Sequence, residues 1–132
     1  MKFNKLIPEL SVSNLEKSIK FYTQIGFKVE YERKKSKFVF LSLQGSQIML
    51  EETNDHWKTG ELKYPFGRGI NFQISVQDIQ PILTCLKKIK YTLKVKPKTN
   101  TYRKGKEILT CREFLVMDPD GYLLRFTQDL EK

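Results

Sequence analysis

The sequence predicts an α+β fold of two tandem βαβββ modules, whose strands form a curved mixed sheet around a concave cleft. Three observations support this fold class. Strand patterns alternate with amphipathic helix patterns, the same order of elements occurs twice, and a shift of 64 residues places residues 10–15 on residues 74–79 with their apolar positions aligned. One module is too small to bury both faces of its sheet. We therefore expect the helices to cover one face and the other face to curve around a cleft or meet a partner.

The first module begins with a strand that contains Pro8. Because proline cannot donate a ladder hydrogen bond, this strand is expected at a sheet edge or with that position turned away from its neighbour. Ser13 or Asn14 can cap the following helix, Gly26 can end it, and Gln44-Gly45 predicts a hairpin turn. The expected strands are residues 6–12, 27–31, 37–43 and 46–51, and the helix carries the apolar stripe Leu15, Ile19, Tyr22 and Ile25.

The second module repeats this order of elements. Asp78 is expected to cap its helix, and Asp118-Pro119-Asp120-Gly121 is a strong turn signal between the last two strands. The expected strands are residues 71–76, 91–95, 113–117 and 122–127, and the helical stripe is Ile79, Leu83, Leu86 and Ile89.

Length and composition predict a single domain over residues 1–132, with a first module at about 5–52, a linker at about 53–68 and a second module at about 69–128. Hydrophobic residues make up 39% of the chain, which is enough for a packed core. No apolar run approaches the ~20 residues that cross a bilayer, and the N-terminus lacks the apolar stretch of a signal peptide. The two cysteines form neither a disulfide framework nor a metal-binding pair, so a cytoplasmic location is expected.

The formal net charge of +9 raises the question of an anionic partner. Nine lysines and arginines, and no acid, lie between Asp78 and Glu107. No recognition-helix motif and no set of stacking aromatics accompanies this charge. Lysine also outnumbers arginine, which is more typical of a solvated basic face than of bidentate phosphate recognition. A nucleic-acid partner is therefore not expected.

Two motifs carry a family resemblance. The first is Pro8-x-Leu10-x-Val12 followed by Leu15-x-x-Ser18-x-x-Phe21-Tyr22-x-x-x-Gly26-Phe27, and the second is Arg112-Glu113-Phe114-x-x-x-Asp118-Pro119-Asp120-Gly121-Tyr122. Together with the paired modules they resemble the vicinal oxygen chelate superfamily, which includes glyoxalase I, extradiol dioxygenases and bleomycin-resistance proteins. The second motif looks most like the bleomycin-resistance branch. The resemblance covers nearly the whole chain and implies the glyoxalase/bleomycin-resistance fold, but this fold hosts unrelated activities.

The resemblance implies four positions at which enzymes of the superfamily hold a divalent metal with His and Glu side chains. The residues here are Ile7, Met49, Asn71 and Arg125. Isoleucine, methionine and arginine do not suit a hard or borderline cation, so we expect no metal, no other cofactor and no catalytic residue. Glu51, on the same strand face as Met49, is the nearest substitute carboxylate.

The expected function is non-catalytic binding and sequestration of a small aromatic or polar molecule, similar to bleomycin-type antibiotic resistance proteins. The alternative is a metal-dependent lyase, transferase or dioxygenase of the same superfamily with a displaced metal site. The resemblance also implies a homodimer, with the first strand either exchanged between subunits or not and with Pro8 at the hinge. The candidate ligand-binding residues are Phe38, Phe40, Met49, Glu51, Trp57, Asn71, Gln73, Tyr102, Arg112 and Arg125.

The net charge bears on the identity of the ligand. Bleomycin is cationic, so a chain with a charge of +9 would repel it, although Glu9, Glu51 and Glu52 could form a local acidic spot. The prediction is therefore for a class of small ligands that includes glycopeptide antibiotics, and not for one compound.

Overall fold

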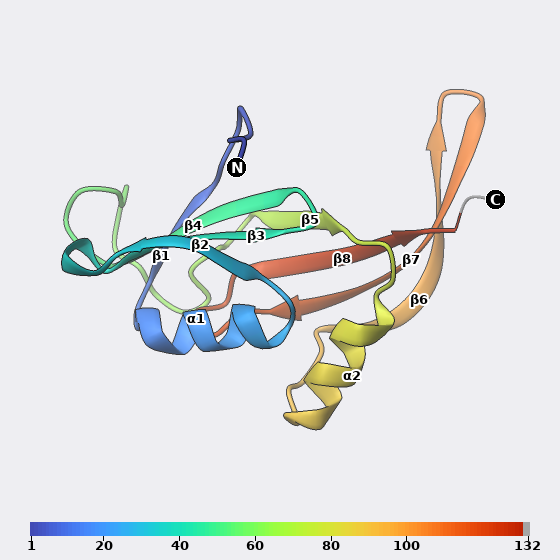
Figure 1. The fold of residues 1–132 in the computed structure, drawn as a ribbon. Helices are drawn as coiled ribbons and strands as arrows, with labels where there is room; N and C mark the ends of the chain where they lie inside the picture. The colour runs from blue at the N-terminus through green and yellow to red at the C-terminus, as the bar shows by residue number, and fades with distance from the viewer. Residues whose placement is uncertain (131–132) are drawn as a thin grey trace.

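The computed structural model describes residues 1–130 and confirms the predicted α+β fold of two βαβββ modules (Figure 1). The first module contains β1 (Glu9–Val12), α1 (Leu15–Gln24), β2 (Lys28–Arg33), a 3-10 turn (Lys34–Ser36), β3 (Phe38–Leu43) and β4 (Ser46–Glu52). The second contains β5 (Asn71–Ser75), α2 (Gln80–Lys88), β6 (Val95–Lys104), β7 (Glu107–Met117) and β8 (Leu123–Asp129). Among these described residues, no helix is long and apolar enough to cross a membrane.

Each module forms its own four-stranded mixed sheet. The strand order is β1-β4-β3-β2 in the first sheet and β5-β8-β7-β6 in the second. In both sheets the first strand of the module runs parallel to the last one, and the remaining pairs are antiparallel. The two halves therefore share one topology, as the 64-residue repeat predicts.

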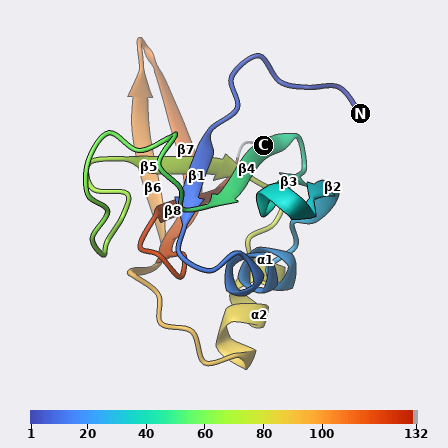
Figure 2. The same cartoon turned by 90° about the vertical axis from the view of Figure 1, so that its left-hand side faces the viewer.

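The two helices lie side by side on the same side of the molecule (Figures 1 and 2). Asn14 caps α1 by accepting a hydrogen bond from the Lys17 amide at 3.0 Å, as one of the two predicted caps. The Cys85 thiol of α2 donates to the carbonyl of Gln24 at the end of α1, with an Sγ–O distance of 2.9 Å. The helices are thus joined directly as well as through the sheets.

One continuous hydrophobic core connects both modules. Leu10 and Val12 of β1 and Ile74 of β5 are buried in it, together with Val76, which follows β5. These are side chains that the alternating strand pattern predicts on the helix-covered faces. The faces that carry Glu9 and Gln73 consequently point away from the helices, and the candidate site lies on those faces.

The prediction of a strand over residues 91–95 is wrong. The Tyr91 amide donates to the carbonyl of Leu86 at 2.9 Å, and Lys90 adopts a left-handed φ of 57°, so these residues complete the end of α2. The Tyr91 hydroxyl then donates to the carbonyl of Met117 at 2.6 Å and anchors the segment as a loop. The strand begins only at Val95.

Strands β6 and β7 form a longer hairpin than the sequence predicts, because β7 begins at Glu107 and not at residue 113. The far end of this hairpin extends beyond the rest of the fold (Figure 1). Lysine, proline and asparagine are depleted in strands, which is why the run Val95–Lys104 carries little strand signal. Pro97 is accommodated by the shift of register between Val95 and Lys98.

The first strand is shorter than predicted, since it begins at Glu9 and not at residue 6. Pro8 lies just outside the strand, where its carbonyl accepts a hydrogen bond from the Met49 amide at 2.9 Å. Strand β1 is at the edge of its sheet, as the proline predicts.

The predicted turn Asp118–Gly121 has a second role that the sequence does not reveal, because it ties the two modules together. Asp118 accepts a hydrogen bond from the Tyr22 hydroxyl of α1 at 2.7 Å. Asp120 accepts from the hydroxyl of Ser13 at 2.6 Å, and the Tyr122 hydroxyl donates to the carbonyl of Ser11 at 2.9 Å. These contacts fix the second module against the start of the first.

Candidate functional site

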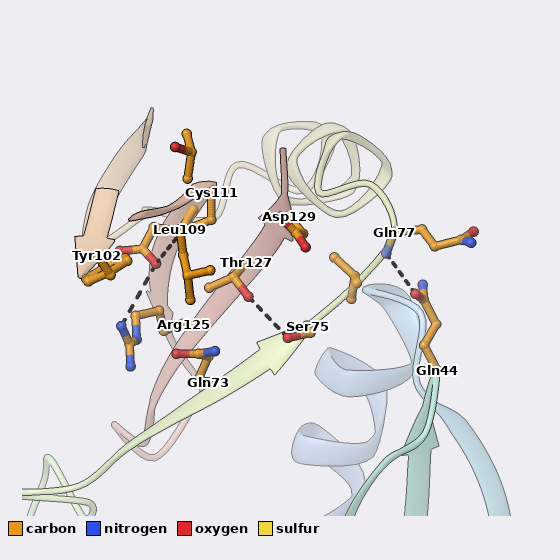
Figure 3. A pocket seen from close by; sticks show the side chains of 13 residues that line it. Gln44, Gln73, Ser75, Gln77, Tyr102, Leu109, Cys111, Arg125, Thr127 and Asp129 are labelled. Carbon is orange, nitrogen blue, oxygen red and sulfur yellow. Dashed lines mark hydrogen bonds and ion pairs between the residues drawn. The ribbon is translucent and has the colours of Figure 1, made fainter. Parts of the chain in front are cut away.

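A cavity of about 810 Å³ lies on the face of the second sheet that points away from the helices. Side chains from β5, β6, β7 and β8 line it, and Gln44 of the β3–β4 turn closes one side (Figure 3). The Gln77 amide donates to the side-chain oxygen of Gln44 at 2.9 Å, which fixes this part of the first module at the edge of the cavity. Such a volume is typical of a site for a drug-sized molecule.

Strand alternation explains which side chains reach the cavity. Gln73 of β5 and Arg125 of β8 are directly paired in the parallel ladder and project to the same face, whereas the neighbouring Ile74 and Phe126 enter the core. Figure 3 shows Gln73 and Arg125 lying close together in the cavity wall. The sequence predicted both of these residues in the site.

Glu113 of β7 is the most deeply buried charged group in the cavity wall, with 4% of its side chain exposed. Its Oε2 atom accepts short hydrogen bonds from the Tyr102 hydroxyl at 2.6 Å and from the side-chain Nδ2 of Asn100 at 2.7 Å. Its Oε1 atom has longer contacts only, 3.7 Å from Sγ of Cys111 and 3.9 Å from Nη1 of Arg125. The carboxylate is therefore held mainly by β6.

Arg125 makes an ion pair with Glu113 that leaves much of its hydrogen-bonding capacity unused. The contact between Nη1 of Arg125 and Oε1 of Glu113 is 3.9 Å, which is too long for a hydrogen bond, and the guanidinium also interacts with the Tyr102 hydroxyl. Its Nε atom is buried and has no hydrogen-bond partner among the described residues. A buried donor without a partner is unfavourable, and in a cavity wall it indicates a position where a ligand can accept.

Two further groups in the cavity wall have a raised pKa. The hydrogen bond to the Glu113 carboxylate raises the pKa of Tyr102, because loss of the phenolic proton would break that bond and bring two negative charges together. Burial raises the pKa of the Cys111 thiol, and the Glu113 carboxylate adds to the effect. Both groups are therefore protonated at neutral pH, and Cys111 does not have the depressed pKa of a reactive thiolate.

The corresponding face of the first sheet is closed by aromatic rings. Phe38 and Phe40 are 3% and 1% exposed, and the Tyr31 ring stacks on Phe40 at a centroid distance of 5.2 Å. The Phe3 ring contacts Phe40 edge-on at 5.4 Å, and the Arg33 guanidinium lies 4.5 Å from the centre of the Phe38 ring. In the chain as described, these two candidate residues are covered by other parts of the same module.

The N-terminal segment holds Phe3 in this place through hydrogen bonds to Gln47 of β4. The Asn4 amide donates to Oε1 of Gln47 at 2.8 Å, and Nε2 of Gln47 donates to the carbonyl of Lys2 at 2.7 Å. The two concave faces of the molecule therefore differ, since one is packed with rings and the other is a polar cavity.

Glu51 and Met49 lie on β4 beside β1, on this ring-covered face. Burial raises the pKa of Glu9, and the nearby Glu51 carboxylate adds to the effect while Arg33 partly offsets it. The Oε1 atom of Glu51 is buried and has no hydrogen-bond partner among the described residues. Glu9 and Glu51 thus form part of the acidic spot expected from the sequence, with Arg33 near Glu9. The third expected acid, Glu52, instead binds Lys37 at 2.9 Å and accepts a hydrogen bond from the Leu15 amide.

Besides the four candidates on the ring-covered face, three more predicted site residues lie outside the cavity. Trp57 is in the segment between the modules and is 68% exposed, and Asn71 is at the exposed first position of β5. Arg112 is on β7 between the cavity-lining residues Cys111 and Glu113, and its paired neighbours are Thr99 and Gln128. Of the ten candidates, the cavity brings together only Gln73, Tyr102 and Arg125.

Sequence analysis missed Glu113, Asn100 and Gln44 as parts of the site. Glu113 belongs to the motif at residues 112–122, but its partners on β6 lie in the stretch that was not recognised as a strand. The period-2 spacing of Asn100 and Tyr102 is the signal that could have revealed this part of the site, because such spacing places both residues on one face of a strand.

The four positions that the family resemblance assigns to a metal do not fit one. Ile7 has no donor atom, Met49 offers only a thioether, and the permanently charged Arg125 guanidinium would repel a cation. Within residues 1–130 there is also no group of three or more His, Cys, Asp or Glu side chains that could hold a metal ion. The donor set therefore gives no basis for a metal-assisted step in the cavity.

The whole-chain pattern and the fold define the class of protein. Residues 5–126 match the Glyoxalase/Bleomycin resistance protein/Dioxygenase superfamily, and this chain belongs to that superfamily. No curated protein matches the chain.

Several solved structures are similar to this chain. TioX from Micromonospora sp. ML1 is 14% identical with a TM-score of 0.74, over 97% of this chain and 100% of that chain. A bleomycin-binding protein in complex with bleomycin is 16% identical with a TM-score of 0.63, over 96% and 98%. A superfamily member from Vibrio splendidus 12B01 is 34% identical with a TM-score of 0.44, over 92% and 95%.

Proposed function

We propose that this protein binds and sequesters a small aromatic or polar molecule in the cavity of its second module, without catalysing a reaction. The observation that carries the proposal is the cavity of about 810 Å³, whose wall combines amide and hydroxyl groups with Arg125 and Glu113. A few convergent polar groups on a formed surface are typical of small-molecule sites.

The chemistry of the wall supports binding more than catalysis. The Cys111 thiol and the Tyr102 hydroxyl both have a raised pKa, and the residues at the superfamily's metal positions do not fit a metal. A protein of the same fold, the bleomycin-binding protein named above, binds bleomycin. For the present chain we propose the ligand class only, since its charge of +9 disfavours a cationic ligand such as bleomycin.

The proposal is tested by filling the cavity. Gln73 is exposed on β5 and projects into the cavity, so Gln73→Trp should block it without disturbing the core. Thr99→Trp is the matched control, because Thr99 is exposed on β6 and pairs with Arg112, outside the cavity lining. The probes are two-ring aromatic amides and acids, and isothermal titration and amide chemical shifts measure their binding. We expect them to bind the parent protein and Thr99→Trp but not Gln73→Trp. Saturable binding that Gln73→Trp leaves unchanged would place the ligand elsewhere and refute the proposal.

We also propose that the protein forms a homodimer with Pro8 at the hinge of its first strand. The support is exposed apolar surface on the N-terminal segment and on the β6–β7 hairpin, where Leu6 is 84% and Ile108 is 59% exposed. Light scattering coupled to gel filtration should give twice the mass of 15.6 kDa. A single species of monomer mass at high micromolar concentration would contradict it.

A further inference from the structure

The cavity wall contains a cationic group, Arg125, whose Nε donor has no hydrogen-bond partner among the described residues. We propose that Arg125 is the receptor for a carboxylate on the ligand, so that the second module selects small aromatic carboxylic acids over neutral or cationic analogues. This inference rests on the proposed binding function and assigns it a ligand chemistry.

The geometry around Glu113 explains why Arg125 remains available. Tyr102 and Asn100 bind Oε2 of Glu113 at 2.6 and 2.7 Å and hold the carboxylate against β6. Arg125 reaches only the other oxygen, at 3.9 Å, so the pair is not the two-bond arrangement that arginine and a carboxylate usually adopt. Glu113 thus orients the guanidinium without saturating it.

The unused donors of Arg125 indicate the shape of the group that would bind. The Nε atom is buried and has no partner among the described residues, while 28% of the side chain is exposed to the cavity. A planar guanidinium presents its donors as a rigid fork that matches the two oxygens of a carboxylate. Gln73 is paired with Arg125 in the ladder, and its amide can donate to the same group.

The other charges of this face do not oppose an anion. Asp129 and Glu113 are acidic, but Arg125 is basic and Lys98 is paired with Glu113 in the β6–β7 ladder and so projects to the same face. The nearby charges therefore balance, and the net charge of +9 on the whole chain favours the approach of an anion.

The apolar part of the ligand is expected beside the guanidinium. Leu109 and Tyr102 lie opposite each other on β7 and β6 and both line the cavity, and Val76 lines it after β5. A flat ring can contact these side chains while its carboxylate faces Arg125 (Figure 3).

The experiment compares 2-naphthoate with 2-naphthamide, which share one ring system and differ in the charge of the headgroup. Isothermal titration gives the affinities, and the Nε–Hε signal of Arg125 in proton–nitrogen correlation spectra reports directly on the proposed contact. We expect the carboxylate to bind the parent protein at least tenfold more tightly than the amide and to shift this signal. Arg125→Gln and Arg125→Lys should lose most of this selectivity, since the first removes the charge and the second removes the fork.

Arg103→Gln is the matched control, because Arg103 is an exposed arginine of β6 that is not part of the cavity lining, and its loss changes the net charge equally. This variant should retain the selectivity. If the amide and the carboxylate shift the backbone amides of Gln73 and Thr127 with equal affinity, the binding function stands and the role of Arg125 is refuted. If neither compound shifts those amides, both the carboxylate proposal and the binding function are refuted for aromatic ligands. The Nε–Hε readout does not depend on whether the variants fold.

Discussion

At the scale of single residues, Asp118 shows how an acid in a turn can also make stability depend on pH. It is 1% exposed, and burial raises its pKa to about 6 although three hydrogen-bond donors around it act in the opposite direction. Because the folded-state pKa lies above the unfolded value, the folded form holds this proton more tightly. The resulting stabilisation is complete below about pH 4 and is lost as the pH rises through about 6.

Replacing Asp118 by Asn should remove this pH dependence. The amide oxygen can still accept from the backbone amides of Asp120 and Tyr122, and the amide nitrogen can donate to the Tyr22 hydroxyl. Between pH 4.5 and pH 7.5 we expect the parent to lose about 2 kcal/mol more of its free energy of unfolding than Asp118→Asn does. Urea unfolding of both proteins at the two pH values measures the difference, and equal losses would show that Asp118 does not titrate in this range.

At the scale of elements, the turn after Asp118 depends on a glycine for two separate reasons. Gly121 has a φ of +93°, and a Cβ atom built there would lie 2.5 Å from Pro65. Gly45 in the β3–β4 turn has nearly the same φ, +92°, but a Cβ atom there meets nothing within 4 Å. The two positions therefore separate backbone strain from steric overlap.

Gly121→Ala should destabilise the protein much more than Gly45→Ala. Strain alone is expected to cost about 1–2 kcal/mol at Gly45, whereas overlap with the backbone of Pro65 adds about 1–3 kcal/mol at Gly121. Thermal and urea unfolding of the two variants give the comparison. Equal destabilisation would mean that the Pro65 loop moves aside at no cost.

The helices and strands also show which parts of the fold and of the candidate site could be predicted from the sequence. Alternation predicted both helices and the sheet faces, and the Asn14 cap and the Gln44-Gly45 turn were predicted as well, because those signals are local. The predicted Asp78 cap is one residue early, since Ile79 is at the N-cap position of α2. The lysine-rich strand β6 was missed, since its pairing with β7 overrides its weak strand propensity. With β6 the contact between Asn100 and Glu113 was missed as well. Of the ten candidate residues, Gln73, Tyr102 and Arg125 lie in the cavity. The groups that cover Phe38 and Phe40 are the rings of Tyr31 and Phe3 and the guanidinium of Arg33, and no spacing in the chain predicts that they meet.

At the scale of the whole molecule, the two modules are expected to unfold as one cooperative unit. They share a continuous core, and the hydrogen bonds of Asp118, Asp120 and Tyr122 join the second module to α1 and β1 of the first. Tyr22→Phe removes the donor to the buried Asp118 carboxylate and should lower the free energy of unfolding by about 1–3 kcal/mol.

Hydrogen exchange distinguishes a loss of stability that both modules share from one confined to a single module. In Tyr22→Phe, the slow amides of β3 in the first module and of β7 in the second should lose protection by the same factor. Faster exchange confined to one module would show that the halves unfold independently.

The unequal concave faces have a consequence for how the two repeats can change. Glu9 and Gln73 occupy equivalent places 64 residues apart. Glu9 is on the face of the first sheet that aromatic rings of the same module fill, whereas Gln73 faces the cavity of the second sheet. A saturation-mutagenesis map scored for folding should therefore show intolerance around the rings of Phe38 and Phe40, and wide tolerance at the polar wall around Gln73. Scored for ligand binding, the same map should instead show intolerance at the polar wall around Gln73. The first repeat would then mainly stabilise the fold, and the second would select the ligand.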